Sequence, residues 1–200
     1  MTTARVALLA AFLVVAGAAT GCSNPTAGPA AISAPTVGQV TRGPVEHTSI
    51  GTGALAGANG SGGEAVVPFD ERAAASIAAG QKVRLRFDAV PGLTLPGEVL
   101  AVAPTGVPIS GVTSYYVTIV LTGGGDARLR GGMTVQATVI TNSLTGVLRV
   151  PNAAVVNHRF VRVPGAGGEP TQVQFTPGLV GDSMTQVLSG LTEGQSVLLN

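Results

Sequence analysis

Hydrophobic and polar residues alternate most regularly at residues 82–89. Four apolar side chains, Val83, Leu85, Phe87 and Ala89, are interleaved with four polar ones, Lys82, Arg84, Arg86 and Asp88. A period of two places the apolar set on one face of a β-strand and the polar set on the other. The segment is therefore predicted to be a strand with one buried and one exposed face.

Short segments rich in valine, isoleucine and threonine recur along the chain, separated by glycine and proline. They cover residues 97–103, 114–121, 133–141, 147–150, 159–163, 172–175, 185–188 and 196–199. A spacing of roughly 10 to 15 residues with turn residues between the segments is typical of a small barrel or sandwich. The pattern therefore predicts a mainly β fold.

One segment has the features of a helix. Asp70 can act as its N-cap, Glu71 lies at the positive end of the helix dipole, and Gly80 can adopt the left-handed conformation that ends helices. We expect one short helix over about residues 70–79, bracketing the β structure.

Residues 1–21 have the pattern of a lipoprotein signal peptide. Arg5 precedes an apolar run at residues 6–20, which is shorter than the roughly 20 residues that span a bilayer. The ending Ala19-Thr20-Gly21-Cys22 resembles a bacterial lipobox, in which cleavage leaves an N-terminal cysteine for acylation by chains such as palmitate. The alternative is an ordinary secretory signal, with Cys22 incidental. Residues 22–38 are rich in proline, alanine, serine and glycine, and are predicted to be a flexible tether.

Composition excludes several classes of protein. Charged residues make up 10% of the chain, the formal net charge is +1, and tryptophan is absent. A polybasic surface and a base-stacking platform are both missing, so nucleic acid is not an expected partner. A single cysteine also excludes a disulfide scaffold.

The candidate chemistry is sparse. Residues 51–57 have the glycine spacing of a dinucleotide-binding loop, but the residues that follow cannot form the required helix. His47 and His158 are more than a hundred residues apart, and no Gly-x-Ser-x-Gly elbow occurs. We therefore expect no catalytic residues, no cofactor and no metal site, and predict that the protein is not an enzyme.

Several segments, taken in order, resemble one known family. They are residues 40–45, 51–53, 66–71, 77–83, 87–92, 97–99, 116–119, 129–135, 147–155 and 187–197. The run is similar to the β-barrel and membrane-proximal domains of the HlyD-like membrane fusion proteins, the periplasmic adaptors of ABC and RND efflux systems. The resemblance implies a small antiparallel, six-stranded type of β-barrel and a membrane-proximal β-domain.

The resemblance also implies a division of the chain into parts. After the tether, residues 39–57 would be the first strand of the membrane-proximal domain, 65–142 the barrel and 143–200 the rest of the membrane-proximal domain. Family members normally insert lipoyl-like halves and a long α-hairpin before the barrel. Here the Gly-rich residues 58–64 stand at that place, which predicts a short form joined by a flexible loop that closes at small entropic cost.

Five cations are candidate contacts to a partner or to lipid. Lys82, Arg84 and Arg86 share one strand face, and Arg128 and Arg130 lie in the Gly-rich loop that follows the strand at residues 114–121. The alternative for the strand residues is a solvated barrel exterior.

As the resemblance implies, we expect a noncatalytic, lipid-anchored adaptor outside the cytoplasm, on the cell membrane. It would bind an ABC permease or an RND pump and could form homo-oligomers. A stand-alone lipoprotein that binds a cell-envelope ligand, or an adaptor that has lost its hairpin module, are the alternatives.

Overall fold

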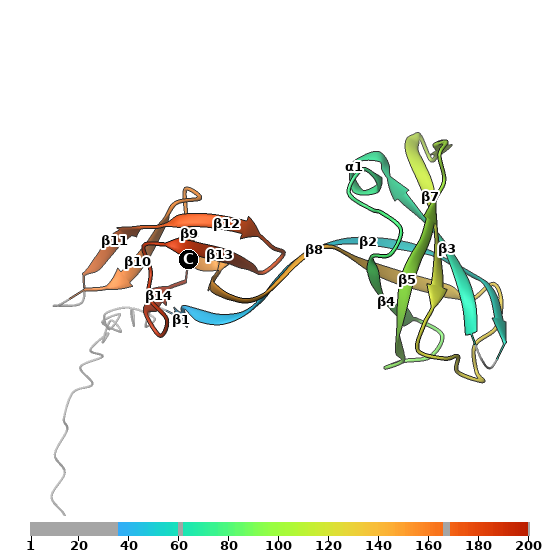
Figure 1. Ribbon diagram of the computed structural model, residues 1–200, viewed down its shortest axis with the longest axis horizontal. Coiled ribbons are helices and arrows are strands. Elements are labelled where there is room, and N and C mark those ends of the chain that lie inside the picture. The colour runs from blue at the N-terminus through green and yellow to red at the C-terminus, as the bar shows by residue number, and fades with distance from the viewer. Residues whose placement is uncertain (1–35, 60–61, 166–168, 200) are drawn as a thin grey trace, which may run out of the picture. The chain divides into compact units, whose positions relative to one another are not determined.

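The computed structural model describes residues 36–59, 62–165 and 169–199 (Figure 1). Six strands build one sheet that closes on itself: β2 (Thr41–Asn59), β3 (Gly62–Asp70), β4 (Lys82–Phe87), β5 (Thr94–Val102), β7 (Val112–Leu121) and β8 (Thr134–Pro151). Their order is β8-β2-β3-β7-β5-β4, and β4 pairs back onto β8. All of these pairings are antiparallel, so the mainly β fold and the six-stranded barrel are confirmed.

The remaining elements are shorter. They are β1 (Val37–Gln39), α1 (Glu71–Ala74), β6 (Val107–Ile109), the 3-10 helix η1 (Asn152–Ala154), β9 (Val155–Val156), β10 (Phe160–Pro164), β11 (Pro170–Gln174), β12 (Thr176–Val180), β13 (Met184–Ser189) and β14 (Ser196–Leu198). β12 and β13 extend the barrel sheet at the end of β8, and β6 pairs with β7.

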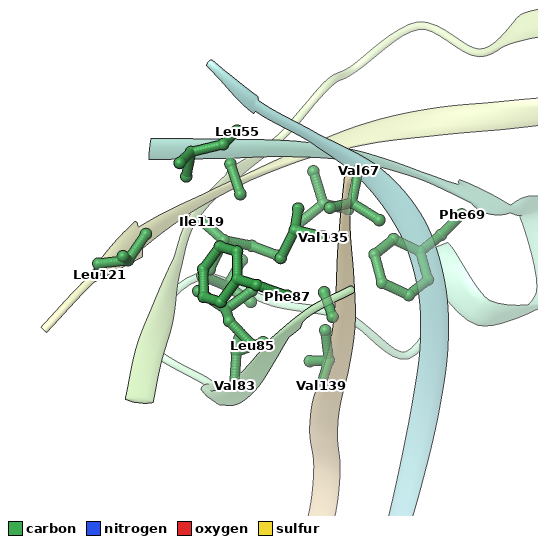
Figure 2. Close-up of a cluster of buried hydrophobic side chains, with 14 of the residues drawn as sticks. Leu55, Val67, Phe69, Val83, Leu85, Phe87, Ile119, Leu121, Val135 and Val139 are labelled. Atoms are coloured by element: carbon green, nitrogen blue, oxygen red, sulfur yellow. The ribbon is translucent and has the colours of Figure 1, made fainter. Parts of the chain in front are cut away.

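The barrel core follows from the alternation in β4. Val83, Leu85 and Phe87 are at most 2% exposed, whereas the cations between them face solvent. Figure 2 shows Phe87 among the other buried side chains of this cluster, including Ile119 from β7 and Val135 from β8. Full burial of each large apolar side chain contributes about 1.5 to 3 kcal/mol.

A second hydrophobic cluster belongs to the C-terminal β-domain, the name used here for β1, β9 to β14 and the paired ends of β2 and β8. Its sheet has the order β1-β14-β10-β11, with β9 also paired to β10. Val40, Val161, Phe175 and Val197 are among its buried side chains. Because the barrel and the C-terminal β-domain both use β2 and β8, the predicted boundaries at residues 57 and 142 fall inside these two strands.

The predicted tether ends earlier than expected. Val37 and Gly38 lie in β1, where they pair with Leu198 and Val197 of β14. Gly38 also lies close to the side chain of Leu199, so a Cβ at this position would come within 2.9 Å of it. The sequence pattern missed this strand because its partner is at the other end of the chain. The earlier residues of the tether lie outside the described residues.

The expected flexible loop at residues 58–64 is largely strand. Ala58 pairs with Gly63 and Asn59 with Gly62, so β2 and β3 form a hairpin whose undescribed connection is residues 60–61. The prediction of an unpaired loop is wrong, because the backbones continue the barrel ladder almost to the turn.

The predicted helix is shorter than residues 70–79. Asp70 is its N-cap and accepts a hydrogen bond from the backbone N–H of Ala73 at 2.8 Å, as expected. Regular helix ends at Ala74, because the side chain of Gln81 accepts from Ala78 N and donates to the carbonyl of Ser76. These bonds hold the following residues in turns, and Gly80 has the expected left-handed φ of 87°.

Candidate functional site

The strand stripe of Lys82, Arg84 and Arg86 points out of the barrel, as predicted. Arg84 donates from both terminal nitrogens to one carboxylate oxygen of Glu46 on β2, at 3.2 Å each. Arg86 lies 3.5 Å from the carboxylate of Asp88. Lys82 is opposite Glu98 of β5 in the strand register, and the described residues give it no salt bridge. Two of the three charges are therefore already compensated within the chain.

Arg128 and Arg130 lie in the loop between β7 and β8 and stabilise its turns. Arg128 forms a bidentate pair with Asp126, at 2.9 and 2.7 Å, and these hydrogen bonds lower the pKa of Asp126 to about 2. Arg130 donates to the carbonyls of Ala127 and Leu129. Among the described residues, no ion pair joins this loop to the β4 stripe, so the five predicted cations do not form one cluster.

Another part of the barrel exterior is apolar. The pairing of β5 with β7 shifts register between Val99 and Ala101, which makes Leu100 the extra residue of a β-bulge. Leu100 is 53% exposed and Tyr116 of β7 is 40% exposed. The barrel exterior thus exposes one large apolar side chain on β5 and one on β7.

A polar cluster that sequence reasoning missed lies where β2 and β8 leave the barrel. It lines a cleft of about 370 Å³, whose residues include Glu46, Thr48, Arg84, Arg149 and Asp182. Arg149 donates to the carbonyl of Pro44 at 2.7 Å, while its buried Nε has no partner among the described residues. The carboxylate of Asp182, in the turn between β12 and β13, accepts from the hydroxyl of Thr48 at 2.5 Å and from its N–H at 3.2 Å.

The ionisation of Asp182 follows from these contacts. Partial burial raises its pKa, but the two hydrogen bonds from Thr48 and the neighbouring His47 outweigh burial, and the net pKa lies below its ordinary value. His47 Nδ1 is 3.3 Å from the Asp182 carboxylate. His47 thus contacts a carboxylate that is far away in the sequence.

The other histidine is part of a turn. Asn157 and His158 have φ of 50° and 62°, and Arg159 N donates to the Val156 carbonyl, which is a tight hairpin turn between β9 and β10. His158 also borders a cleft of about 470 Å³ that is lined partly by Val155, Pro177 and Val180.

The glycine-rich residues 51–57 belong to strand β2, where close packing accounts for Gly51 and Gly53 without a nucleotide. A Cβ on Gly51 would lie 2.8 Å from Val67 and 2.9 Å from Phe69, and one on Gly53 would lie 2.2 Å from the carbonyl oxygen of Val66. β2 therefore uses glycine to approach β3 closely.

The structure leaves the predicted anchor untested. Cys22 and the predicted signal peptide lie outside the described residues. Among the residues that are described, no helix is both long enough and apolar enough to cross a membrane.

Comparisons with known proteins agree with the barrel. Residues 64–143 match the family described as CusB-like, beta-barrel domain. A search of curated proteins gave no match. The crystal structure of MacA from Actinobacillus actinomycetemcomitans is 26% identical over 72% of this chain and 44% of its own, with a TM-score of 0.59.

A second solved structure covers nearly the same part of the chain. It is a MacA–MexA chimera containing the α-hairpin domain of Pseudomonas aeruginosa MexA, with 26% identity, a TM-score of 0.53, and coverage of 70% of this chain and 46% of its own. The protein thus spans less than half the length of these two solved relatives. The closed six-stranded barrel, the family match over residues 64–143 and this likeness together show that the chain carries a CusB-like β-barrel domain and is similar to membrane fusion proteins.

Proposed function

We propose that this protein is a noncatalytic adaptor subunit of a membrane export system and binds the extracytoplasmic face of an ABC or RND transporter. The observation that carries the proposal is the CusB-like barrel together with 26% identity to MacA over 72% of the chain. An adaptor acts by binding one state of its partner more tightly than another, and it shifts the transport cycle by that difference.

The proposed contact surface is the exterior of β4. Lys82 is its most available charge, because Arg84 and Arg86 each have a carboxylate partner within the chain. Exposed ion pairs contribute only about 0 to 1 kcal/mol, so a transporter carboxylate can replace Glu46 or Asp88 at small cost. Arg128 and Arg130 are weaker candidates, because their hydrogen bonds stabilise the loop that carries them.

The proposed anchor is a lipid on Cys22, which would hold the protein on the outer face of the cell membrane. Its support is the lipobox-like sequence alone. Growth with an alkyne analogue of palmitate should label the wild-type protein and leave Cys22→Ala unlabelled. Equal labelling of both proteins, or of neither, would exclude this anchor.

Deletion of the gene tests the adaptor role. Loss of an adaptor should slow export by the partner transporter and make cells more sensitive to its substrates. Wild-type protein supplied in trans should restore export, and Lys82→Glu should restore it less well. Lys82→Gln removes the charge without reversing it and serves as the matched control. Unchanged export after deletion would contradict the role.

The alternative, a stand-alone ligand-binding lipoprotein, has one observation in its favour. The cleft of about 470 Å³ beside His158 is partly lined by valine and proline side chains. A lipoprotein of this kind should be stabilised against heat by its ligand, and its deletion should leave every export activity intact.

A further inference from the structure

The ribbon formed by β2 and β8 is irregular at one place. Gly43 pairs with Val147 but Val45 pairs with Leu144, and His47 pairs with Asn142 but Thr48 pairs with Ile140. Two register shifts therefore fall within residues 43–48 of β2, which we call the junction segment. Bulges interrupt the ladder of backbone hydrogen bonds, so backbone pairing alone joins the two strands less completely here.

Side chains supply the hydrogen bonds that the interrupted ladder lacks. Arg149 donates to the carbonyl of Pro44, and the hydroxyl of Thr141 donates to the carbonyl of His47. Asp182, in the β12–β13 turn, supplies further hydrogen bonds. Its backbone N–H donates to the carbonyl of Glu46 at 2.9 Å. The Asp182 carboxylate accepts from the N–H and the hydroxyl of Thr48. The turn thus binds both edges of the second bulge.

The close approach of this turn depends on Gly181. A Cβ there would lie 2.4 Å from the carbonyl oxygen of Glu46 and 2.9 Å from the side chain of Val45. Gly181 is buried although the neighbouring Asp182 is exposed. The absence of a side chain at this position therefore lets the Asp182 carboxylate reach Thr48.

The junction segment is also held from the barrel. The carboxylate of Glu46 accepts from Arg84 of β4, and the Glu46 carbonyl accepts from Asp182 of the C-terminal β-domain. Val45 is fully buried between these contacts, although it belongs to neither hydrophobic cluster. One short stretch of β2 is thus bound from both domains by polar contacts that are individually weak.

We propose that the contact of Asp182 with Thr48 is a releasable latch that couples the barrel to the C-terminal β-domain. With the contact made, the bulged ribbon is stiff. When it is broken, residues 43–48 lose two hydrogen bonds and the ribbon flexes at the junction segment. The latch goes beyond the proposed adaptor function and does not depend on it, because it is a property of the isolated protein.

Amide hydrogen exchange on the full-length protein in detergent tests the latch. Asp182→Ala should speed exchange at residues 43–48 and 140–147 by about three- to tenfold, the factor expected for half-exposed hydrogen bonds. Exchange in β7 and β10 should stay unchanged. Asp126→Ala is the matched control, because it removes a carboxylate that binds an arginine in a barrel loop.

A milder variant separates the latch from general destabilisation. Thr48→Val keeps the shape of the side chain and removes its hydroxyl donor, so it should speed exchange at the same residues by a smaller factor, and Thr48→Ser should restore the wild-type rate. Unchanged exchange at the junction segment in Asp182→Ala and Thr48→Val would overturn the proposal. Equal acceleration throughout the chain would also overturn it, because Asp182 would then contribute only to global stability.

Discussion

The close approach of β2 to β3 makes Gly53→Ala a sharp test of the barrel. The new Cβ would lie 2.2 Å from the carbonyl oxygen of Val66 and 2.7 Å from the Cα of Val67. Both are backbone atoms, so no change of rotamer can relieve the overlap. Moving the oxygen contact from 2.2 Å to the 3.0 Å minimum seen for real Cβ atoms requires a shift of 0.8 Å.

The barrel has little freedom to make that shift. Gly53 is also paired with Val135 of β8, and β8 closes the barrel onto β4. Overpacking of a core usually costs about 1 to 3 kcal/mol. We expect Gly53→Ala to reach the upper end of this range, about 3 kcal/mol, because the clash is with backbone in a closed sheet.

Urea unfolding followed by far-ultraviolet circular dichroism measures the effect, and the same strand offers the control. A Cβ on Gly57 meets nothing within 4 Å, so Gly57→Ala should be neutral or stabilise the protein by about 0.4 to 1 kcal/mol. If the two variants unfold within about 0.5 kcal/mol of each other, β2 and β3 do not approach as described and the argument fails.

Two further predictions concern the acidic latch and the barrel core. Because the pKa of Asp182 is lower in the folded protein than its ordinary value of 3.8, the carboxylate stabilises the fold above that pH and less as the pH falls through the folded-state value. Asp182→Asn should therefore unfold at a lower temperature than wild type at pH 6, and this difference in unfolding temperature should shrink below about pH 4. If the difference stays the same at all pH values, the lower stability of the variant comes from changed packing and not from the lost charge. Phe87→Ala, at a position that is 1% exposed, should lower the free energy of unfolding by about 3 to 5 kcal/mol in urea, and a loss below about 1 kcal/mol would show that Phe87 is not in the core.

Strands with one buried and one solvent-exposed face were predictable from the sequence. Strands that form only because they pair with a segment far away in the sequence were not. The alternation of residues 82–89 identified β4 because its buried and exposed sides follow from local sequence alone. Residues 133–141 and 147–150 were predicted as two strands, yet they are one strand, β8. The turn-like residues between them still pair with β2, across two register shifts.

The contacts of the candidate site could likewise be predicted only in part. Exposure of Lys82, Arg84 and Arg86 followed from the period of two, but the Arg84 partner is 38 residues away in the sequence and Asp182 is 134 residues from Thr48. No local sequence pattern indicates contacts between residues so far apart in the chain. A proline within the β2 segment and the Gly181–Asp182 turn were the available signals, and each is also common in ordinary loops.

Capture of the protein from chemically crosslinked membranes tests the central claim most directly. A tagged wild-type chain should recover the subunits of one integral-membrane transporter, and Lys82→Glu should recover less of the same subunits. Recovery of no transporter from crosslinked membranes, with the tagged protein itself captured in full, would contradict the adaptor function.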